Sequence, residues 1–381
     1  MGLTLCLPVL ANPTMAKAKA EVSAVAKHLN NADSAGIPLA SIALLLPART
    51  SGLARAADAL RTGFLTAYER DRSGLAITVI EVADTSADML SAYHTASQKF
   101  DILVGPLSRT GITAIVANGK VIKPTIALTL PDLPADKDAT LPRLLLPIGL
   151  SIEAEARQVA RWVATEQGNG KVFVIADGAS WQRRIAGAFI QEAASVGLGS
   201  ELISINLKTD NLEKIKQRIE KEHPRALFLA LDTDQAKQVL NGLGVVGDVT
   251  PLYGISQLNQ IARNGNNARA IREADRNAEL NGIRLVDIPW QLQPDHPAVM
   301  LYPRQAVSAG HQRNADLERL YALGIDAFNV AREVAMRQPS FQINGVTGKL
   351  NIGFGVGIPS FERVEPTAVY RDGVVVPLET Y

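Results

Sequence analysis

The chain has 381 residues, of which 47% are hydrophobic and 20% charged, with 39 basic side chains against 38 acidic ones. This is the composition of an ordinary globular protein, and the length favours two lobes of roughly 150 residues each. The balanced charge excludes the broad basic surface with which proteins bind nucleic acid, and no run of about 20 apolar residues is present to cross a membrane. The single cysteine, Cys6, excludes an internal disulfide and a cysteine-based metal site.

The first 40 residues have the features of an export signal followed by a linker. Residues 3–11 form a short apolar run followed by small residues, but the basic segment that opens a secretory signal is missing. Residues 3–6, Leu-Thr-Leu-Cys, resemble a lipobox, with Leu5 where a small residue is usual. A truncated signal, a lipid on Cys6 and an irrelevant terminus stay open as alternatives. We expect a signal remnant and linker over residues 1–40, and a periplasmic protein. In the alternative with a lipid on Cys6, the N-terminus would anchor the protein to the outer membrane.

The first strand predicted by the sequence is also the clearest. Residues 42–47 are wholly apolar, stop at the polar loop of residues 49–52, and precede an amphipathic pattern. A strand buried on both faces and followed by a helix has this pattern. The pattern recurs through the first 150 residues. The expected strands are 41–47, 76–83, 101–105, 124–129 and 143–149, and the expected helices are 53–71, 87–99 and 109–119.

At Ser151 a second series of strands and helices begins. Ser151 precedes Glu153 and Glu155, and this order is typical of a helix N-terminus. The expected strands are 171–177, 201–207, 226–231 and 251–256, and the expected helices are 181–196, 210–222 and 233–243. Two such series predict an α/β fold of two lobes, each a mostly parallel sheet flanked by helices, with a crevice between them.

The last hundred residues are more varied. Residues 258–279 are polar and indicate a helix or an extended surface loop, and residues 282–290 are expected to be a strand that Pro289 ends. A long helix is expected over 317–336. Antiparallel strands are expected in the tail, at 345–352 and 369–376, because Asp372-Gly373 is typical of a hairpin turn.

Ligands of open α/β sheets bind outside the carboxyl ends of the strands, so the residues that follow each strand are candidate ligand contacts. In the first lobe these candidates are Arg49, Thr50, Ser51, Asp84, Thr85, Leu107, Ser108 and Thr129. In the second lobe they are Asp177, Trp181, Asp232 and Gln257.

Two interpretations of these candidates stay open. For an amino-acid-like ligand, Ser108 and Thr129 would bind the carboxylate and either Asp177 or Asp232 the ammonium group. In the structural alternative, Ser51, Thr85 and Ser108 cap their own helices, and Asp84 and Asp177 end strands.

Motifs for catalysis, cofactors or metals are missing from the sequence. It has no Gly-rich phosphate loop and no GxSxG turn, and its five histidines are scattered without the spacing of a metal site. Glu153 and Glu155 are explained by the helix N-terminus. We therefore expect no enzyme activity, no cofactor and no metal.

The order of the elements resembles the type I periplasmic binding-protein fold. The segments that carry this resemblance are IALLLP at 42–47, ILVGPL at 102–107, PTIALT at 124–129 and SIEAEAR at 151–157. Four more segments are similar to the LppC-type bacterial lipoproteins, a family that includes penicillin-binding-protein activators. These are ADGASWQRR at 176–184, YGISQ at 253–257, DIPW at 287–290 and LYALGIDA at 320–327, and the resemblance spans about residues 41–376.

The resemblance implies a division into lobes. Residues 41–150 plus about 293–338 would form the first lobe, and residues 151–292 plus about 339–381 the second. Trp290 would be a packed aromatic residue at the hinge. Activators of this family carry a helical-repeat domain ahead of this module, and only about 40 residues precede the first strand here. We therefore expect that domain to be absent.

The resemblance also implies a function. A non-catalytic protein of the cell envelope would dock on a bifunctional penicillin-binding protein and activate it in peptidoglycan synthesis. The alternative is a solute-binding receptor of an ABC importer or sensor, which closes on a small amino-acid-like ligand by hinge motion. Leu107 and Leu130 make the expected cleft more apolar than an amino-acid site requires, and this favours the docking role.

Overall fold

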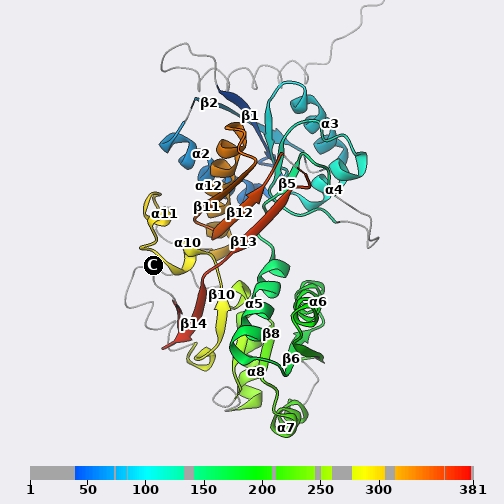
Figure 1. Ribbon diagram of the computed structural model, residues 1–381, viewed down its shortest axis with the longest axis vertical. Helices are drawn as coiled ribbons and strands as arrows, with labels where there is room; N and C mark the ends of the chain where they lie inside the picture. The colour runs from blue at the N-terminus through cyan, green and yellow to red at the C-terminus, as the bar shows by residue number, and fades with distance from the viewer. Residues whose placement is uncertain are drawn as a thin grey trace, which may run out of the picture.

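The protein forms two α/β lobes, one above the other in Figure 1. The structure, a computed structural model, describes residues 39–72, 74–83, 85–132, 141–207, 212–244, 250–259, 277–304, 314–355 and 357–378. The expectations for residues 1–38, which include Cys6, for Asp84 and for most of the stretch 258–279 lie outside these residues.

The first lobe is built on a five-stranded sheet in the order β2-β1-β3-β4-β5. All neighbouring strands in it are parallel. Their bounds are β1 (Ala40–Pro47), β2 (Leu75–Val82), β3 (Ile102–Val104), β4 (Thr125–Ala127) and β5 (Leu145–Pro147). The five strands predicted for this part of the chain are confirmed.

Strand β1 shows why its sequence is a continuous apolar run. Side chains alternate between the two faces of a sheet, and both faces of this sheet are covered. Ile42, Leu44 and Leu46 pack in one core cluster with α2 (Ala54–Arg70) and α12 (Ala315–Ala335). Ala43 and Leu45 pack in another with α3 (Ser86–Ser97) and α4 (Arg109–Asn118).

Helix α12 joins the first lobe although it lies far along the sequence from the first sheet. It packs against α2 with two glycines at the contact. A Cβ atom on Gly63 would lie 1.9 Å from the carbonyl oxygen of Tyr321, and one on Gly324 would lie 2.1 Å from that of Leu60. No side chain fits at either position, so the backbones of the two helices are in direct contact there.

The second lobe is built on a seven-stranded sheet in the order β15-β14-β10-β9-β8-β6-β7. The parallel strands are β6 (Lys171–Asp177), β7 (Gly199–Ile205), β8 (Ala226–Ala230), β9 (Leu252–Gly254) and β10 (Arg284–Val286). Helices α5 (Ile152–Gln167) and α6 (Ser180–Ser195) cover one face of the sheet, and α7 (Glu213–Glu222) and α8 (Thr233–Leu243) cover the other.

The predicted hairpin of the tail is confirmed. Strands β14 (Thr367–Arg371) and β15 (Val374–Pro377) pair antiparallel at the edge of the second sheet. Asp372 and Gly373 connect them with positive φ angles of 50° and 69°. Such φ angles at both central residues are those that a tight hairpin turn requires.

Three further strands form a separate antiparallel sheet that was not expected as a unit. They are β11 (Ser340–Asn344), β12 (Lys349–Gly353) and β13 (Ser360–Val364). Val346, Leu350 and Ile352 belong to the same core cluster as α2 and α12. We therefore propose a division of the chain in which residues 339–364 pack with the first lobe, and only β14 and β15 of the tail with the second.

The predicted strand over 282–290 is too long. Strand β10 ends at Val286, and Pro289 opens the short helix α10 (Pro289–Leu292), which α11 (Pro297–Met300) follows. Proline suits the first position of a helix, because its ring fixes φ and no N–H is needed there. The short turns η2 (Ser256–Leu258) and η3 (Ala278–Leu280) flank the polar stretch.

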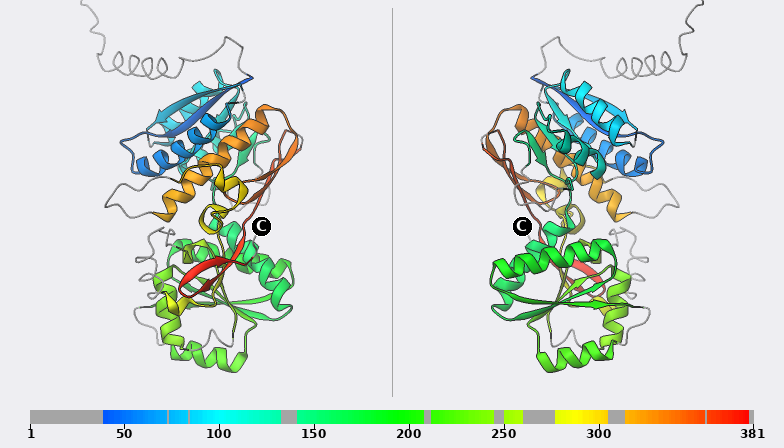
Figure 2. Two further views of the ribbon diagram at one scale, coloured as in Figure 1. Left: turned by 90° about the vertical axis from the view of Figure 1, so that its left-hand side faces the viewer. Right: turned by 90° about the vertical axis from the view of Figure 1, so that its right-hand side faces the viewer.

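In the described part of the chain there are three crossings between the lobes, between β5 and α5, between β10 and α10, and between β13 and β14 (Figure 2). Strands β5 and β10 each leave their parallel sheet at the carboxyl end and enter the other lobe. The carboxyl edges of the two sheets therefore face each other across the crossings.

Candidate functional site

The described candidate residues lie on these two facing edges. After the strands of the first lobe come Arg49, Thr50, Ser51, Thr85, Leu107, Ser108 and Thr129. After the strands of the second lobe come Asp177, Trp181, Asp232 and Gln257. The fold thus brings each set to one edge of its sheet.

Two hydroxyl groups of the first lobe cap their own helices, and a third lies in the loop before α2. Thr85 Oγ1 accepts a hydrogen bond from the Asp88 N–H at 3.0 Å. Ser108 Oγ accepts from the Gly111 N–H at 3.3 Å, and Ser51 Oγ from the Leu53 N–H at 2.9 Å. The structural alternative is therefore confirmed for Thr85 and Ser108, and it is wrong for Ser51, because α2 begins after Leu53 without a side-chain cap. A ligand role for the three residues stays a prediction.

The remaining first-lobe candidates lie close to ion pairs or to the crossing. The exposed Arg49 pairs with Glu81 at 3.3 Å. Leu107 is partly buried against the first-lobe core. Thr129 lies beside the crossing to α5, where a Cβ atom on Gly149 would be only 2.6 Å from the Cα of Thr129. Because β3 and β4 are neighbours, Leu107 and Thr129 follow adjacent strands.

Two glutamines that the sequence interpretation missed join the acidic candidates of the second lobe. Gln235 Nε2 donates to Asp177 Oδ2 at 3.3 Å, and Gln182 Nε2 donates to Gln235 Oε1 at 2.6 Å. Asp232 caps α8, where its Oδ1 accepts from the Gln235 N–H at 2.9 Å. An ammonium ligand would therefore meet carboxylates that already accept internal hydrogen bonds.

The other two second-lobe candidates are held mainly by packing. Trp181 is partly buried against the core cluster under α5 and α6. The carbonyl oxygen of Gln257 accepts a hydrogen bond from Thr233 Oγ1 at 3.4 Å. Ligand contact by either residue stays a prediction.

The most concentrated polar chemistry lies at the crossings, and sequence reasoning missed it. Arg319 of α12 donates to the buried carboxylate of Asp287 at 3.1 Å through Nε and at 2.7 Å through Nη2. Its Nη2 also donates to the carbonyl oxygens of Ser256 and Asn259, at 3.1 and 2.9 Å. Burial acts to lower the pKa of Arg319, but the attraction of Asp287 outweighs it and the pKa is raised. A helix of the first lobe thus holds the strand ends of the second.

The guanidinium of Arg363 connects the first and the third crossings. Arg363 of β13 donates to the carbonyl oxygens of Ile148 and Gly149 at 2.7 and 3.0 Å, and to Thr347 Oγ1 at 3.1 Å. Thr347 in turn donates to Asp326 Oδ2 at 2.6 Å. Burial raises the pKa of Asp326, and the hydrogen bonds from Thr347 oppose that rise.

Two further carboxyl groups are buried beside these guanidiniums. Glu155 Oε2 accepts from the Ser256 N–H at 2.9 Å, and burial raises the pKa of Glu155 to about 7. Burial also raises the pKa of Glu365, and the negative charge of Glu155 raises it further. Glu153, which the sequence interpretation grouped with Glu155, instead pairs with Arg184 at 2.8 Å near the surface.

Trp290 is the packed aromatic residue at the second crossing. Its side chain is 1% exposed, the Tyr321 ring lies 5.2 Å away, and the Arg304 guanidinium lies 4.7 Å from its ring centroid. Its backbone N–H donates to the carbonyl oxygen of Val346 at 3.0 Å. Trp290 therefore connects α10 to the first-lobe core, and a role in hinge motion stays a prediction.

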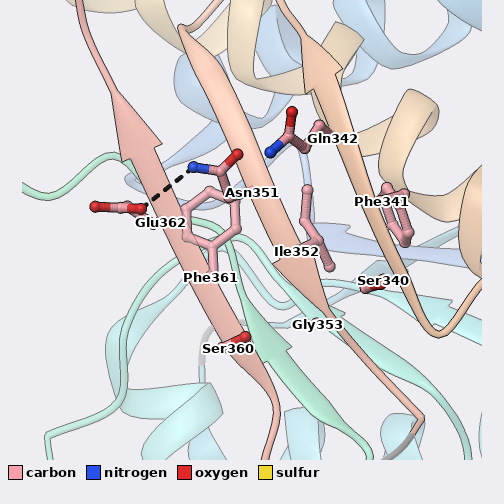
Figure 3. A pocket seen from close by; sticks show the side chains of 9 residues that line it. All are labelled: Ser340, Phe341, Gln342, Asn351, Ile352, Gly353, Ser360, Phe361 and Glu362. Atoms are coloured by element: carbon pink, nitrogen blue, oxygen red, sulfur yellow. Dashed lines mark hydrogen bonds between the residues drawn. The ribbon is translucent and has the colours of Figure 1, made fainter.

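An open hollow of about 510 Å³ lies on the sheet of β11, β12 and β13 (Figure 3). Its polar lining comes from alternate positions of the three strands, and Asn351 Nδ2 donates to Glu362 Oε2 across them at 3.2 Å. The lining residues are Ser340, Phe341, Gln342, Asn351, Ile352, Gly353, Ser360, Phe361 and Glu362. Sequence reasoning gave no indication of this surface.

The described residues lack two features, a helix that could span a membrane and a cluster of metal ligands. None of the described helices combines the length and apolar character needed to cross a membrane. Within the same part of the chain, no three His, Cys, Asp or Glu side chains gather as a metal site would require.

Two sheets that face each other at their carboxyl edges, joined by three crossings, define a two-lobed protein of the type I periplasmic binding-protein fold. The chain belongs to the LppC family. The family model, described as "LppC putative lipoprotein", matches residues 10–359.

Two curated relatives of this chain have the same name as each other. "Penicillin-binding protein activator LpoA" of Serratia proteamaculans is 27% identical over 335 residues, which cover 78% of this chain and 47% of that protein. The protein of that name from Vibrio antiquarius is 28% identical over 341 residues, which cover 81% of this chain and 54% of its own. The chain therefore spans about half the length of these curated relatives.

Two solved structures are similar over most of the chain. The LpoA C-domain from Haemophilus influenzae, described as "a regulator of PBP1A", is 23% identical, with a TM-score of 0.70, and the match covers 89% of this chain and 100% of that one. A "putative branched-chain amino acid ABC transporter" from Chromobacterium violaceum is 30% identical, with a TM-score of 0.68, and the match covers 87% of this chain and 99% of that one. The first likeness shows the fold alone.

Proposed function

We propose that this chain is a non-catalytic, exported protein that docks on a bifunctional penicillin-binding protein and activates it in peptidoglycan synthesis. The observation that carries the proposal is membership of the LppC family. The curated relatives named above are penicillin-binding protein activators, and the matched C-domain is described as a regulator. The chain would then act through a docking surface that increases the activity of the penicillin-binding protein.

The geometry of the facing edges supports docking over closure on a solute. Thr85, Ser108 and Asp232 cap helices, and Asp177 is already bonded to Gln235. A small ligand would have to replace these internal contacts, whereas a docking protein can keep them. Arg319 also holds a helix of one lobe to the strand ends of the other. A connected pair of lobes is a suitable scaffold for a docking surface.

Export and anchoring belong to the same proposal. The family is described as lipoproteins, and Cys6 is the sole cysteine in the sequence and hence its one thiol for lipid attachment. Metabolic labelling with a fatty acid should mark the wild-type chain and leave Cys6→Ser unmarked. Equal labelling of both chains, or of neither, would remove the anchor from the proposal.

A binding experiment tests the docking role. The purified full chain is titrated against each bifunctional penicillin-binding protein of its own organism in detergent, by thermophoresis or by surface plasmon resonance. We expect saturable binding to one of these enzymes. A leucine-binding protein of the same fold serves as a control and should not bind. Absence of binding to every such enzyme at tens of micromolar would contradict the proposal.

A solute-receptor function is the second candidate, and one observation favours it. The similarity to the Chromobacterium violaceum protein, described as an amino acid transporter, reaches 30% identity over 99% of that chain. Thermal-shift screening against amino acids tests it, since a ligand at a hundredfold excess over its Kd stabilises the native state by about 2.7 kcal/mol.

A substitution of Asp232 tests whether a thermal shift in that screen depends on recognition of an ammonium group. Asp232→Asn keeps a good helix cap and removes the charge an ammonium ligand needs, so it should abolish a true amino-acid shift. The exposed neighbour Asp234→Asn is the matched control and should keep the shift. No shift with any amino acid would exclude this second candidate for the compounds screened.

A further inference from the structure

The charges buried at the crossings do not balance. Four carboxyl groups lie there, those of Glu155, Asp287, Asp326 and Glu365, and each residue is at most 7% exposed. The guanidiniums that face them are the buried Arg319 and the partly buried Arg363. Ionised carboxyls buried without compensating charge cost several kcal/mol each. The crossings therefore hold protons on some of these carboxyls.

The hydrogen bonds indicate which carboxyls hold protons. Asp287 accepts from both Arg319 and Asn259, and Asp326 accepts from the N–H groups of Val346 and Thr347. These contacts stabilise ionised carboxylates. In contrast, Glu365 Oε2 is buried without a hydrogen-bond partner among the described residues. A buried carboxylate oxygen without a donor is unfavourable, and a protonated carboxyl is not.

Glu155 is the second carboxyl that lacks sufficient compensation. Among the described residues, Ser256 alone donates hydrogen bonds to its carboxyl, through the backbone N–H at 2.9 Å and through the side chain. The charged groups that face Glu155 and Glu365 are Asp287 from the β10–α10 crossing, Arg319 from α12 and Arg363 from β13. Burial raises the pKa of both residues, that of Glu155 to about 7.

Both carboxyls lie at crossings between the lobes. Glu155 lies in the first turn of α5, directly after the first crossing, and Glu365 lies in the third crossing itself. Gln158 of α5 holds the backbone of Glu365 from both sides, with hydrogen bonds of 2.7 Å to its carbonyl oxygen and 3.0 Å from its N–H. A change of charge on either carboxyl therefore acts directly on two of the three crossings.

We propose that the lobe crossing is a proton-linked hinge, in which protonated Glu155 and Glu365 hold the lobes at one angle and the loss of these protons frees the second lobe to rotate against the first. Rotation lets water reach the carboxylates, which lowers the cost of their charge. This proposal concerns the fold of the chain and does not depend on its docking partner.

The test measures the distance between the lobes as a function of pH. Spin labels are placed on the full chain at Thr110→Cys in α4 and Gln191→Cys in α6, both exposed, in a Cys6→Ser background. We expect a narrow distance distribution at pH 5.5, and a shifted or broadened one at pH 8.5 with a midpoint near 7. A distribution that is unchanged over this pH range overturns the proposal, whatever the variants do.

Amide variants identify the groups responsible. Glu155→Gln and Glu365→Gln keep the shape of the side chain and stay neutral, so the double variant should hold the narrow distribution at both pH values. The exposed Glu362→Gln, also on β13, is the matched control and should follow the wild type. A double variant that still shifts with pH as the wild type does would assign the transition to other groups and reject this hinge.

Discussion

The glycine contact between α2 and α12 leads to a prediction that can be worked out from distances. In Gly324→Ala, the new Cβ atom would lie 2.1 Å from the Leu60 carbonyl oxygen and 2.8 Å from the Phe64 nitrogen. Both neighbours are backbone atoms, so the whole helix must move by more than 1 Å to reach ordinary contact. Overpacking of this kind costs about 1–3 kcal/mol.

The higher helix propensity of alanine opposes this loss of stability, and a glycine without close neighbours measures its effect alone. Alanine is favoured over glycine inside a helix by about 0.5–1 kcal/mol. We therefore expect Gly324→Ala to lower the free energy of unfolding by about 1–2 kcal/mol. Gly187→Ala in α6, where no atom beyond the local helix backbone lies within 4 Å of the new Cβ, should raise the free energy of unfolding by about 0.5–1 kcal/mol.

The assay must report on the first lobe, because two lobes need not unfold together. Trp290 lies in the first-lobe core, whereas Trp162 and Trp181 pack in the second. In a background with Trp162→Phe and Trp181→Phe, urea titration followed by fluorescence monitors the helix contact. A Gly324→Ala variant as stable as its parent, or stabilised like Gly187→Ala, would refute the close approach of the two helices.

Three further predictions concern the crossings and one helix cap. Burial raises the pKa of Glu155 from 4.5 to about 7, so the folded protein binds this proton more tightly than the unfolded chain does. The contribution of the bound proton to the free energy of unfolding is therefore complete below pH 4.5 and is lost as the pH rises through 7. Urea titrations should therefore find Glu155→Gln close to wild type at pH 4.5 and about 3 kcal/mol more stable at pH 8; an equal difference at both pH values would contradict this. Arg319→Met leaves the Asp287 carboxylate buried and unpaired, and should destabilise by about 3–5 kcal/mol in the same assay. Adding Asp287→Asn to Arg319→Met should recover part of the lost free energy of unfolding, because no buried charge is then left unpaired. If the free-energy changes of the two substitutions simply add in the double variant, the ion pair does not contribute to stability. Thr85→Ala should cost about 1 kcal/mol in thermal unfolding through the lost cap of α3, and no change would mean that the cap is not formed.

The sequence predicts the regular part of the fold well, because burial leaves a simple periodic trace. The runs at 42–47 and 171–177 are covered on both faces, so they contain few polar residues, and both are strands. The turn at Asp372-Gly373 is a local signal and was predicted correctly. Strands β11 and β13 were missed because one of their faces is exposed, so Ser340, Gln342 and Asn344 interrupt the apolar positions.

The crossings could be predicted far less well, since their chemistry depends on residues far apart in the sequence. Arg319 and Asp287 are 32 positions apart, and Glu365 and Gln158 are 207 positions apart. One signal was present in α12. Arg319 and Asp326 fall on the helix face of Ala322, Leu323 and Val330, and charged residues on an apolar face indicate buried partners.

The candidate ligand residues illustrate a different limit. Position after a strand correctly placed Ser108, Thr129, Asp177 and Asp232 on facing edges. Position alone does not distinguish a cap from a ligand contact, because both use the same oxygen atoms at a helix start. Gln182 and Gln235 were missed since a glutamine inside a helix has no special pattern.

The measurement that tests the central claim most directly is the effect of the chain on its partner's reactions. The full chain is added to a bifunctional penicillin-binding protein of its own organism, and glycan polymerisation and peptide cross-linking are followed separately. We expect a saturable increase in at least one rate, with a half-maximal concentration that matches the Kd from direct binding. Binding without any change in either rate, or no effect at saturating concentration, would contradict the claim that this chain is an activator.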